Sequence, residues 1–394
     1  MSRTTPPPLP KAAPRPAQSP LPEQQVVKQI RPPTRVAVVR RALIGLVVLA
    51  ALAGGSAWLL DASIEPGDEF AAAPTAGKAG LATVRSWGYQ LQRLDIGKAA
   101  AARHDLIVVD ESLDGAALSE QGPKALARLK RKPDGNRRIV LSYLSIGEAE
   151  DYRPYWRSAW VAPAGPITGS TGLKNLATIG STAARAHVRL AAAPAEGRLL
   201  APTAAAPSWL GLENSEWRGN YRVRYWHPDW QALIYGTPAA AIDRIAAAGF
   251  DGVYLDRADV YALWGGEQAT AKPDMVEFIV GLAAYARQLK PGFVVIMQNA
   301  EELLADKRLR GAIDGVAKED LLFGITAEGQ ENPVSDIDAS LRYLKLARGD
   351  GLPVLVVEYL TDDAAIDKAR ARIKAEGFVP YFGSRLLNSL EREH

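Results

Sequence analysis

The sequence predicts an α/β protein whose main domain is a (β/α)8 TIM barrel, preceded by a disordered N-terminal tail and one transmembrane helix. Two observations predict the barrel. Eight short apolar runs alternate with longer amphipathic runs, and most of the amphipathic runs start with Asp or Pro. A doubly wound open sheet is the competing architecture. It receives little support because no Gly-x-Gly-x-x-Gly turn follows the first strand.

Three segments precede the barrel. Residues 1–41 are basic and rich in proline, and such a stretch buries too little apolar surface to fold, so we expect a disordered cytoplasmic tail. Residues 42–60 carry no charge and, as a helix, rise about 28 Å, close to the thickness of the bilayer core, so we expect them to be a transmembrane helix or signal anchor. Residues 61–84, rich in Ala, Gly and Pro, are expected to form a linker.

The charges around residues 42–60 set the expected orientation in the membrane. Arginines precede the segment and carboxylates follow it, and the positive side stays in the cytoplasm. The rest of the chain is therefore expected in the periplasm or the extracellular space, with the membrane as a partner of residues 42–60. We expect an uncleaved anchor. Cleavage near Ala71–Ala73, as in a signal peptide, is the alternative and would give a secreted protein.

Composition excludes several classes of function. The basic excess behind the net charge of +3 lies before residue 42, which argues against nucleic acid as a partner. Cysteine is absent, so disulfides, thiolate metal sites and a cysteine nucleophile are excluded. No histidines are paired at metal-ligand spacing and no Gly-x-Ser-x-Gly elbow is present, so we expect no metal, no cofactor and no serine hydrolase.

Residues 85–394 contain the expected barrel. Its eight strands are expected at Trp87–Leu91, Asp105–Val109, Arg138–Leu144, Phe250–Leu255, Phe293–Met297, Gly315–Ala317, Val354–Val357 and Phe378–Tyr381. Helices are expected at Pro123–Arg131, Pro238–Ala248, Asp274–Leu289, Asp336–Arg348 and Asp363–Glu376. The segment at about 160–207, rich in Ala, Gly, Pro and Thr, interrupts this rhythm. We expect it to be a loop insertion, either a lid or a flexible segment.

Carboxylates stand where several expected strands end. In a barrel these ends meet at one mouth, where enzymes of this architecture carry out their chemistry. Asp256 follows the fourth strand and is the first candidate for a catalytic group. Glu319 is its expected partner, because Gly315 and Ala317 on the same strand face are small and leave room for a ligand. The competing interpretation of Asp256 is a helix cap or an ion pair with Arg257.

Paired carboxylates beside aromatic rings are typical of sugar hydrolysis. One carboxylic acid protonates the glycosidic oxygen, and the other carboxylate attacks the sugar or activates water. The residues expected to bind substrate are Trp87, Tyr89, Asp110, Tyr143, Glu148, Tyr225, Trp226, Asn299, Glu358, Tyr359 and Tyr381. Other roles remain open: Glu148 and Glu358 as polar supports, Asp110 as a loop anchor, and the carboxylates together as a divalent-metal site.

Several motifs occur in the order of a known family: Trp87 to Leu91, Asp105 to Asp110, Tyr143 to Glu150, Asn220 to Trp226, Gly249 to Asp256, and Ile313 to Asp320. Together they resemble the endo-α-1,4-polygalactosaminidase family of glycoside hydrolases (family 114) and its extracellular bacterial and archaeal relatives. The resemblance spans roughly residues 85 to 385. It implies a (β/α)8 fold, hydrolysis of α-1,4-linked galactosamine polymers by a retaining mechanism, and an acidic pair that matches Asp256 and Glu319.

We therefore expect a membrane-tethered glycoside hydrolase that cleaves an amino-sugar polysaccharide outside the cytoplasm. Asp256 is expected to be the nucleophile or base, and Glu319 the general acid/base. Two other functions remain open. One is a non-catalytic polysaccharide-binding barrel in envelope or exopolysaccharide handling, and the other is a metal-dependent carbohydrate deacetylase.

Overall fold

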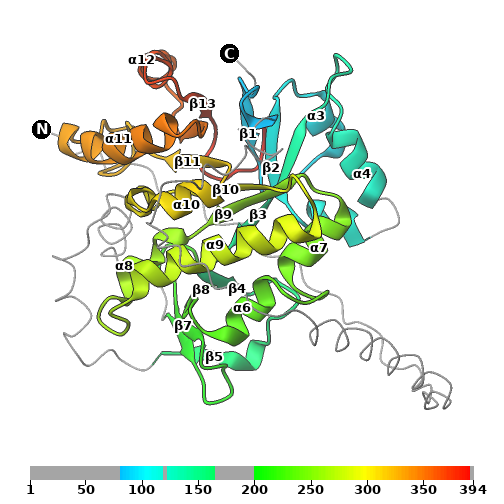
Figure 1. The fold of residues 1–394 in the computed structure, drawn as a ribbon, viewed down its shortest axis with the longest axis vertical. Coiled ribbons are helices and arrows are strands. Elements are labelled where there is room, and N and C mark those ends of the chain that lie inside the picture. The colour runs from blue at the N-terminus through cyan, green and yellow to red at the C-terminus, as the bar shows by residue number, and fades with distance from the viewer. Residues whose placement is uncertain (1–79, 119–121, 165–198, 391–394) are drawn as a thin grey trace, which may run out of the picture. The chain divides into compact units, whose positions relative to one another are not determined.

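The computed structural model describes residues 80–118, 122–164 and 199–390. At its centre lies an eight-stranded sheet in which every neighbouring pair is parallel, in the order β1-β2-β3-β9-β10-β11-β12-β13 (Figure 1). The strands are β1 (Trp87–Tyr89), β2 (Leu106–Asp110), β3 (Ile139–Ser145), β9 (Gly252–Asp256), β10 (Val294–Gln298), β11 (Gly315–Glu319), β12 (Val354–Glu358) and β13 (Val379–Phe382). All eight expected strands are present.

The two end strands, β1 and β13, lie side by side and nearly close the sheet into a barrel. The indole nitrogen of Trp87 in β1 donates to the carbonyl oxygen of Val379 in β13 at 3.1 Å. The hydroxyl of Tyr381 donates back to the carbonyl oxygen of Tyr89 at 3.4 Å. These side-chain bonds join the edges where no backbone ladder pairs the two strands. The α/β class and the TIM-barrel architecture are thus confirmed.

Strand alternation divides the core into two layers. In β9, Tyr254 points into the barrel, where it packs in a cluster with Trp87 and Tyr89. Val253 and Leu255 point outward and pack in the layer between the strands and the helices. Because each fully buried Val or Leu side chain stabilises the fold by roughly 1.5–3 kcal/mol, this alternation fixes which face of the strand turns inward.

The helices follow the strands in sequence. They are α3 (Ile96–Ala101), α4 (Gly122–Leu129), α6 (Pro228–Ile234), α7 (Ala241–Ala248), α8 (Tyr261–Trp264), α9 (Ala271–Leu289), α10 (Lys307–Ala312), α11 (Val334–Gly349) and α12 (Asp363–Ala375). Helix α7 ends at Gly249, whose φ of +99° suits glycine. The N–H of Phe250 still donates to Ile245 in this cap, so β9 begins at Gly252 rather than at Phe250 as expected.

Two small antiparallel sheets were not expected from the sequence. Strands β4 (Glu148–Glu150), β8 (Asn220–Val223) and β7 (Leu210–Glu213) form one sheet, which Figure 1 shows next to α6. Strands β5 (Val161–Pro163) and β6 (Leu200–Pro202) form the other. The two described ends of the segment expected as a loop insertion, at about 160–207, therefore pair with each other as strands. Residues 165–198 lie outside the described part.

The expected tail (1–41), the expected membrane segment (42–60) and residues 61–79 of the expected linker also lie outside the described residues. Within residues 80–118, 122–164 and 199–390, no helix has both the length and the apolar character needed to cross a bilayer.

Candidate active site

Asp256 and Glu319 meet at the carboxyl end of the barrel. Asp256 is the last residue of β9 and Glu319 is the last residue of β11, and β10 runs between these two strands. Gln298, the last residue of β10, donates its side-chain Nε2 to Asp256 Oδ1 and to Glu319 Oε2, each at 2.8 Å. Because both oxygens lie 2.8 Å from one nitrogen, they are at most twice that distance apart. The structure therefore brings the two expected carboxylates together.

Three donors hold the carboxyl group of Asp256. Besides Gln298, the hydroxyl of Tyr143 donates to Oδ2 at 2.8 Å and the backbone N–H of Arg257 donates to Oδ1 at 2.7 Å. Arg257 has a φ of +63°, an uncommon conformation outside glycine, directly after the strand. Burial and, next, the negative charge of Glu319 raise the pKa of Asp256 to about 7, and the guanidinium of Arg257 offsets part of this rise.

Glu319 has a matching set of donors. The side-chain amide of Asn299 donates to Oε2 at 3.0 Å, and its carbonyl oxygen accepts the backbone N–H of Glu319 at 3.1 Å. The hydroxyl of Tyr359 donates to Oε1. Asn299 thus holds both the backbone and the side chain of Glu319, and Tyr143 and Tyr359 play equivalent parts for the two carboxylates.

Three aromatic residues that were expected to bind sugar lie in the barrel interior instead. The ring centroid of Trp87 lies 6.1 Å from that of Tyr254 and 5.4 Å from that of Tyr381, and Tyr89 lies 5.1 Å from Tyr254. Trp87 is 1% exposed. The expectation of substrate binding is corrected for Trp87, Tyr89 and Tyr381, because their ring faces are covered by one another and leave no room for a sugar to stack.

Tyr225 and Trp226 are not near the pair either. Tyr225 is fully buried, stacks on Phe278 of α9 and donates its hydroxyl to the carbonyl oxygen of Ala271. Trp226 packs edge-on against Tyr225 and Trp264. Both belong to the layer between strands and helices, which corrects their expected role in substrate binding. The sequence placed them near the fourth strand, but the intervening β8 carries them outside the barrel.

Glu148 and Glu358 are buried supports rather than residues that face a ligand. Glu148 Oε1 lies 3.0 Å from Arg257 Nη2 and accepts the side-chain amide of Asn214 at 3.0 Å. Glu358 accepts the backbone N–H groups of Leu322 and Phe323 at 2.7 and 3.2 Å. Burial raises the pKa of Glu358 to about 8. The polar-support interpretation therefore applies to both.

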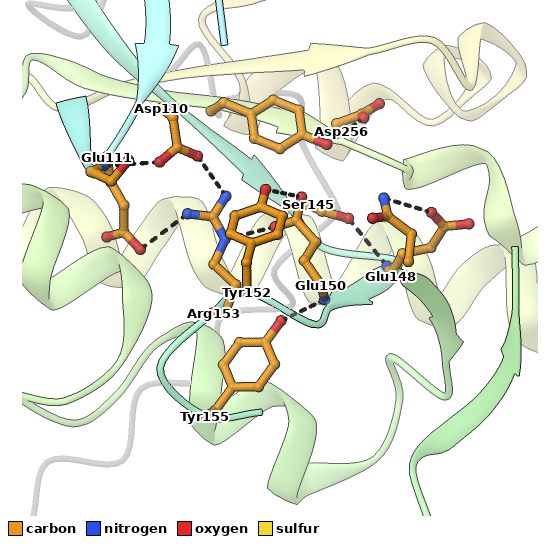
Figure 2. A network of polar contacts seen from close by, with 12 residues as sticks. Asp110, Glu111, Ser145, Glu148, Glu150, Tyr152, Arg153, Tyr155 and Asp256 are labelled. Atoms are coloured by element: carbon orange, nitrogen blue, oxygen red, sulfur yellow. Dashed lines mark hydrogen bonds and ion pairs between the residues drawn. The ribbon is translucent and has the colours of Figure 1, made fainter. Parts of the chain in front are cut away.

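Asp110 belongs to a charged network around Arg153, shown in Figure 2. Arg153 forms ion pairs with Asp110 at 2.8 Å, with Glu150 at 2.7 Å and with Glu111 at 3.4 Å. Asp110 also accepts the backbone N–H of Ser112 at 2.9 Å, so it anchors the turn after β2. Sequence reasoning missed Arg153, because it lies in the unexpected region after β4.

Gln298 is the site residue that sequence reasoning missed most clearly. A usable signal was present: Val294, Ile296 and Gln298 alternate along the fifth expected strand, and the first two pack inside the barrel. A polar third member of that inward series indicates a side chain at the mouth. Within the described ranges, no group of three or more His, Asp or Glu side chains is arranged to hold a metal ion.

One family model matches this chain, and related sequences and similar solved structures are known. The sequence model of glycoside-hydrolase family GH114 matches residues 196–393, half of the chain. An uncharacterised protein of Methanocaldococcus jannaschii is 33% identical over 311 residues, which cover 75% of this chain and 74% of that protein. The solved glycoside hydrolase domain of PelA from Pseudomonas aeruginosa is 20% identical, with a TM-score of 0.48 and coverage of 78% of this chain and 97% of that one. Ega3 of Aspergillus fumigatus, solved in complex with galactosamine, is 13% identical, with a TM-score of 0.45 and coverage of 81% and 96%.

Proposed function

The chain belongs to glycoside-hydrolase family GH114, and from this membership we propose that it cleaves an α-1,4-linked polysaccharide of the galactosamine type outside the cytoplasm. The observation that carries the proposal is the pair of carboxylates, Asp256 and Glu319, bridged by one amide of Gln298. Support for the extracytoplasmic site comes from the apolar, uncharged residues 42–60 and the arginines before them.

The spacing of the pair favours retention of anomeric configuration. Carboxyl groups of retaining glycosidases lie about 5 to 5.5 Å apart, whereas inverting enzymes need about 6.5 to 9.5 Å to admit a water molecule. In this site the bridged oxygens of Asp256 and Glu319 are separated by no more than twice 2.8 Å. One carboxylate then attacks the anomeric carbon directly, and a glycosyl-enzyme intermediate forms.

The pair also has the protonation that this reaction needs. Two interacting carboxyls lose their protons in separate steps, and the raised pKa of Asp256, at about 7, indicates that the pair keeps one shared proton up to neutral pH. Following the family resemblance, we assign the role of general acid/base to Glu319 and that of nucleophile to Asp256. Glu319 gives the shared proton to the glycosidic oxygen as Asp256 attacks. It then removes a proton from the water that hydrolyses the intermediate.

The environment of each carboxyl supports this division of roles. The backbone N–H of Arg257 donates to Asp256 and cannot accept a proton, which favours the ionised nucleophile. The donors to Glu319 are the side chains of Gln298, Asn299 and Tyr359, and the Tyr359 hydroxyl can rotate and accept a hydrogen bond from a protonated carboxyl, as the Tyr143 hydroxyl can at Asp256.

Isosteric variants test the proposal. Asp256→Asn and Glu319→Gln are each expected to release no new reducing ends from an α-1,4-galactosamine polymer, while wild type and the surface control Glu277→Gln release them equally. Azide then separates the roles. Asp256→Ala with azide is expected to form a glycosyl azide of inverted configuration, and Glu319→Ala one of retained configuration. Cleavage of the polymer by both isosteric variants at the wild-type rate would remove the pair from the reaction.

A further inference from the structure

Sugar rings stack on aromatic faces that solvent can reach, and the barrel-interior rings do not offer such faces. Among the aromatic side chains in the described part of the chain, Tyr152 and Trp217 are broadly exposed, at 61% and 46%. We propose that Tyr152, with Trp217 at the same end of the three-stranded sheet, forms a stacking platform that holds the polysaccharide chain beyond the point of cleavage. This inference rests on the proposed function and extends it to the length of substrate that the site engages.

Both aromatic residues lie at the same end of the three-stranded sheet. Glu150, the last residue of β4, pairs with Asn220, the first residue of β8. Tyr152 follows this pair on one strand, and Trp217 precedes it on the other. The N–H of Asp151 donates to the carbonyl oxygen of Gly219 at 2.9 Å, which ties the two segments together.

The ring of Tyr152 is held in place before any ligand binds. Its hydroxyl donates to Glu150 Oε1 at 2.6 Å, and the guanidinium carbon of Arg153 lies 4.7 Å from the ring centroid (Figure 2). Arg153 is itself held by its ion pairs with Asp110 and Glu150. One ring face therefore rests on a buried cation while most of the side chain remains open to solvent. A ring fixed in this way costs little entropy when a ligand stacks on it.

A short series of contacts connects the platform to the catalytic pair. Tyr143 donates its hydroxyl to Asp256 at 2.8 Å. Tyr143 of β3 is paired in register with Asp110 of β2, and Asp110 forms the 2.8 Å ion pair with Arg153, whose guanidinium lies against the ring of Tyr152. A polymer with one sugar at Asp256 and Glu319 would extend from there toward Tyr152.

The alternative is that Tyr152 serves only to satisfy the buried carboxylate of Glu150. The two interpretations differ in which part of the side chain matters. A platform needs the ring and tolerates loss of the hydroxyl, whereas a support for Glu150 needs the hydroxyl. Tyr152→Phe and Tyr152→Ala therefore separate them.

The first experiment compares α-1,4-galactosamine oligomers of two units and of about eight units. For the long oligomer, Tyr152→Ala is expected to raise KM about tenfold with kcat unchanged, and Trp217→Ala is expected to act in the same direction. Tyr152→Phe keeps the ring and its contact with Arg153, so for the long oligomer it should raise KM much less than Tyr152→Ala does. Leu289→Ala is the matched control, since this side chain is 44% exposed at the far end of α9 from the barrel mouth. Equal losses in Tyr152→Phe and Tyr152→Ala, or equal effects on both oligomers, would overturn the platform.

A binding measurement keeps this test separate from that of the proposed function. In the Glu319→Gln background, calorimetry with the same oligomers is expected to show affinity that grows with chain length and falls about tenfold on adding Tyr152→Ala. If wild type cleaves no oligomer, the proposed function fails, but this affinity difference still supports the platform. Equal affinities with and without the Tyr152 ring, or no affinity for any oligomer, refute it.

Discussion

The shared proton of the acidic pair has a measurable consequence for stability. Asp256→Asn removes one of two partly buried like charges and preserves the local hydrogen bonds. The remaining oxygen keeps the bonds from Gln298 and the Arg257 backbone, and the new amide group donates to the hydroxyl of Tyr143, which can accept. The variant is therefore expected to be inactive and yet more stable than wild type at alkaline pH.

The magnitude follows from the pKa. The pKa of Asp256 is raised from 3.8 to about 7, chiefly by burial. Between these values folded Asp256 binds more protons than it does in the unfolded chain, so the contribution of this group to stability is fully present below pH 4 and is lost as pH rises through 7. Three pH units at about 1.36 kcal/mol each set a ceiling of about 4 kcal/mol for this loss. The Asp256→Asn variant has no carboxyl at this position and therefore does not lose this stability as the pH rises.

The assay is urea unfolding of wild type and Asp256→Asn at pH 4 and pH 8. Other titrating groups cancel when the stability difference between the two proteins at one pH is subtracted from that at the other. The variant is expected to gain up to about 4 kcal/mol relative to wild type on going from pH 4 to pH 8. The control, Glu277→Gln, lies in an exposed ion pair with Arg308 and is expected to change by less than about 1 kcal/mol. Identical pH dependence of wild type and Asp256→Asn would refute the coupled, buried pair.

Two further predictions concern activity. The kcat/KM of wild type is expected to fall about tenfold per pH unit above pH 7, as the pair loses its last proton, and a flat profile from pH 6 to 9 would contradict this. Gln298→Leu removes the donor shared by the two carboxylates, so kcat/KM is expected to fall about a hundredfold and the alkaline limb to move to higher pH. Wild-type kcat/KM together with an unmoved limb in Gln298→Leu would show that the bridge has no part in catalysis.

The barrel was predictable because each strand shows its alternation directly in the sequence. Tyr254 and Asp256 share one face of β9, and the run of apolar residues between Phe250 and Leu255 identifies the strand. The ends of such strands meet at one mouth by topology alone, which is why Asp256 and Glu319 were expected together. A strand can be recognised from the alternation of its own residues, without knowing which strands lie beside it.

The sugar-binding aromatics were poorly predicted because alternation identifies the face of a strand but not what covers it. Trp87 and Tyr89 were correctly placed on strand β1, yet Tyr254 and Tyr381 fill the space around them. Tyr225 was assigned to the mouth because the short strands β4, β7 and β8 give no clear pattern of their own. The position of Tyr152 depends on the same sheet, so sequence reasoning could not find it.

The buried carboxylates Glu148 and Glu358 stabilise the conformation of the loops at the mouth of the barrel. Each fixes the segment that directly follows one member of the pair. Glu148 pairs with the side chain of Arg257, and the uncommon φ of that residue turns its N–H toward Asp256. Glu358 accepts two backbone N–H groups three and four residues after Glu319. Two carboxylates outside the pair therefore hold the segments that follow Asp256 and Glu319, since a strand end is held by its strand on one side only and needs a second anchor where the loop begins.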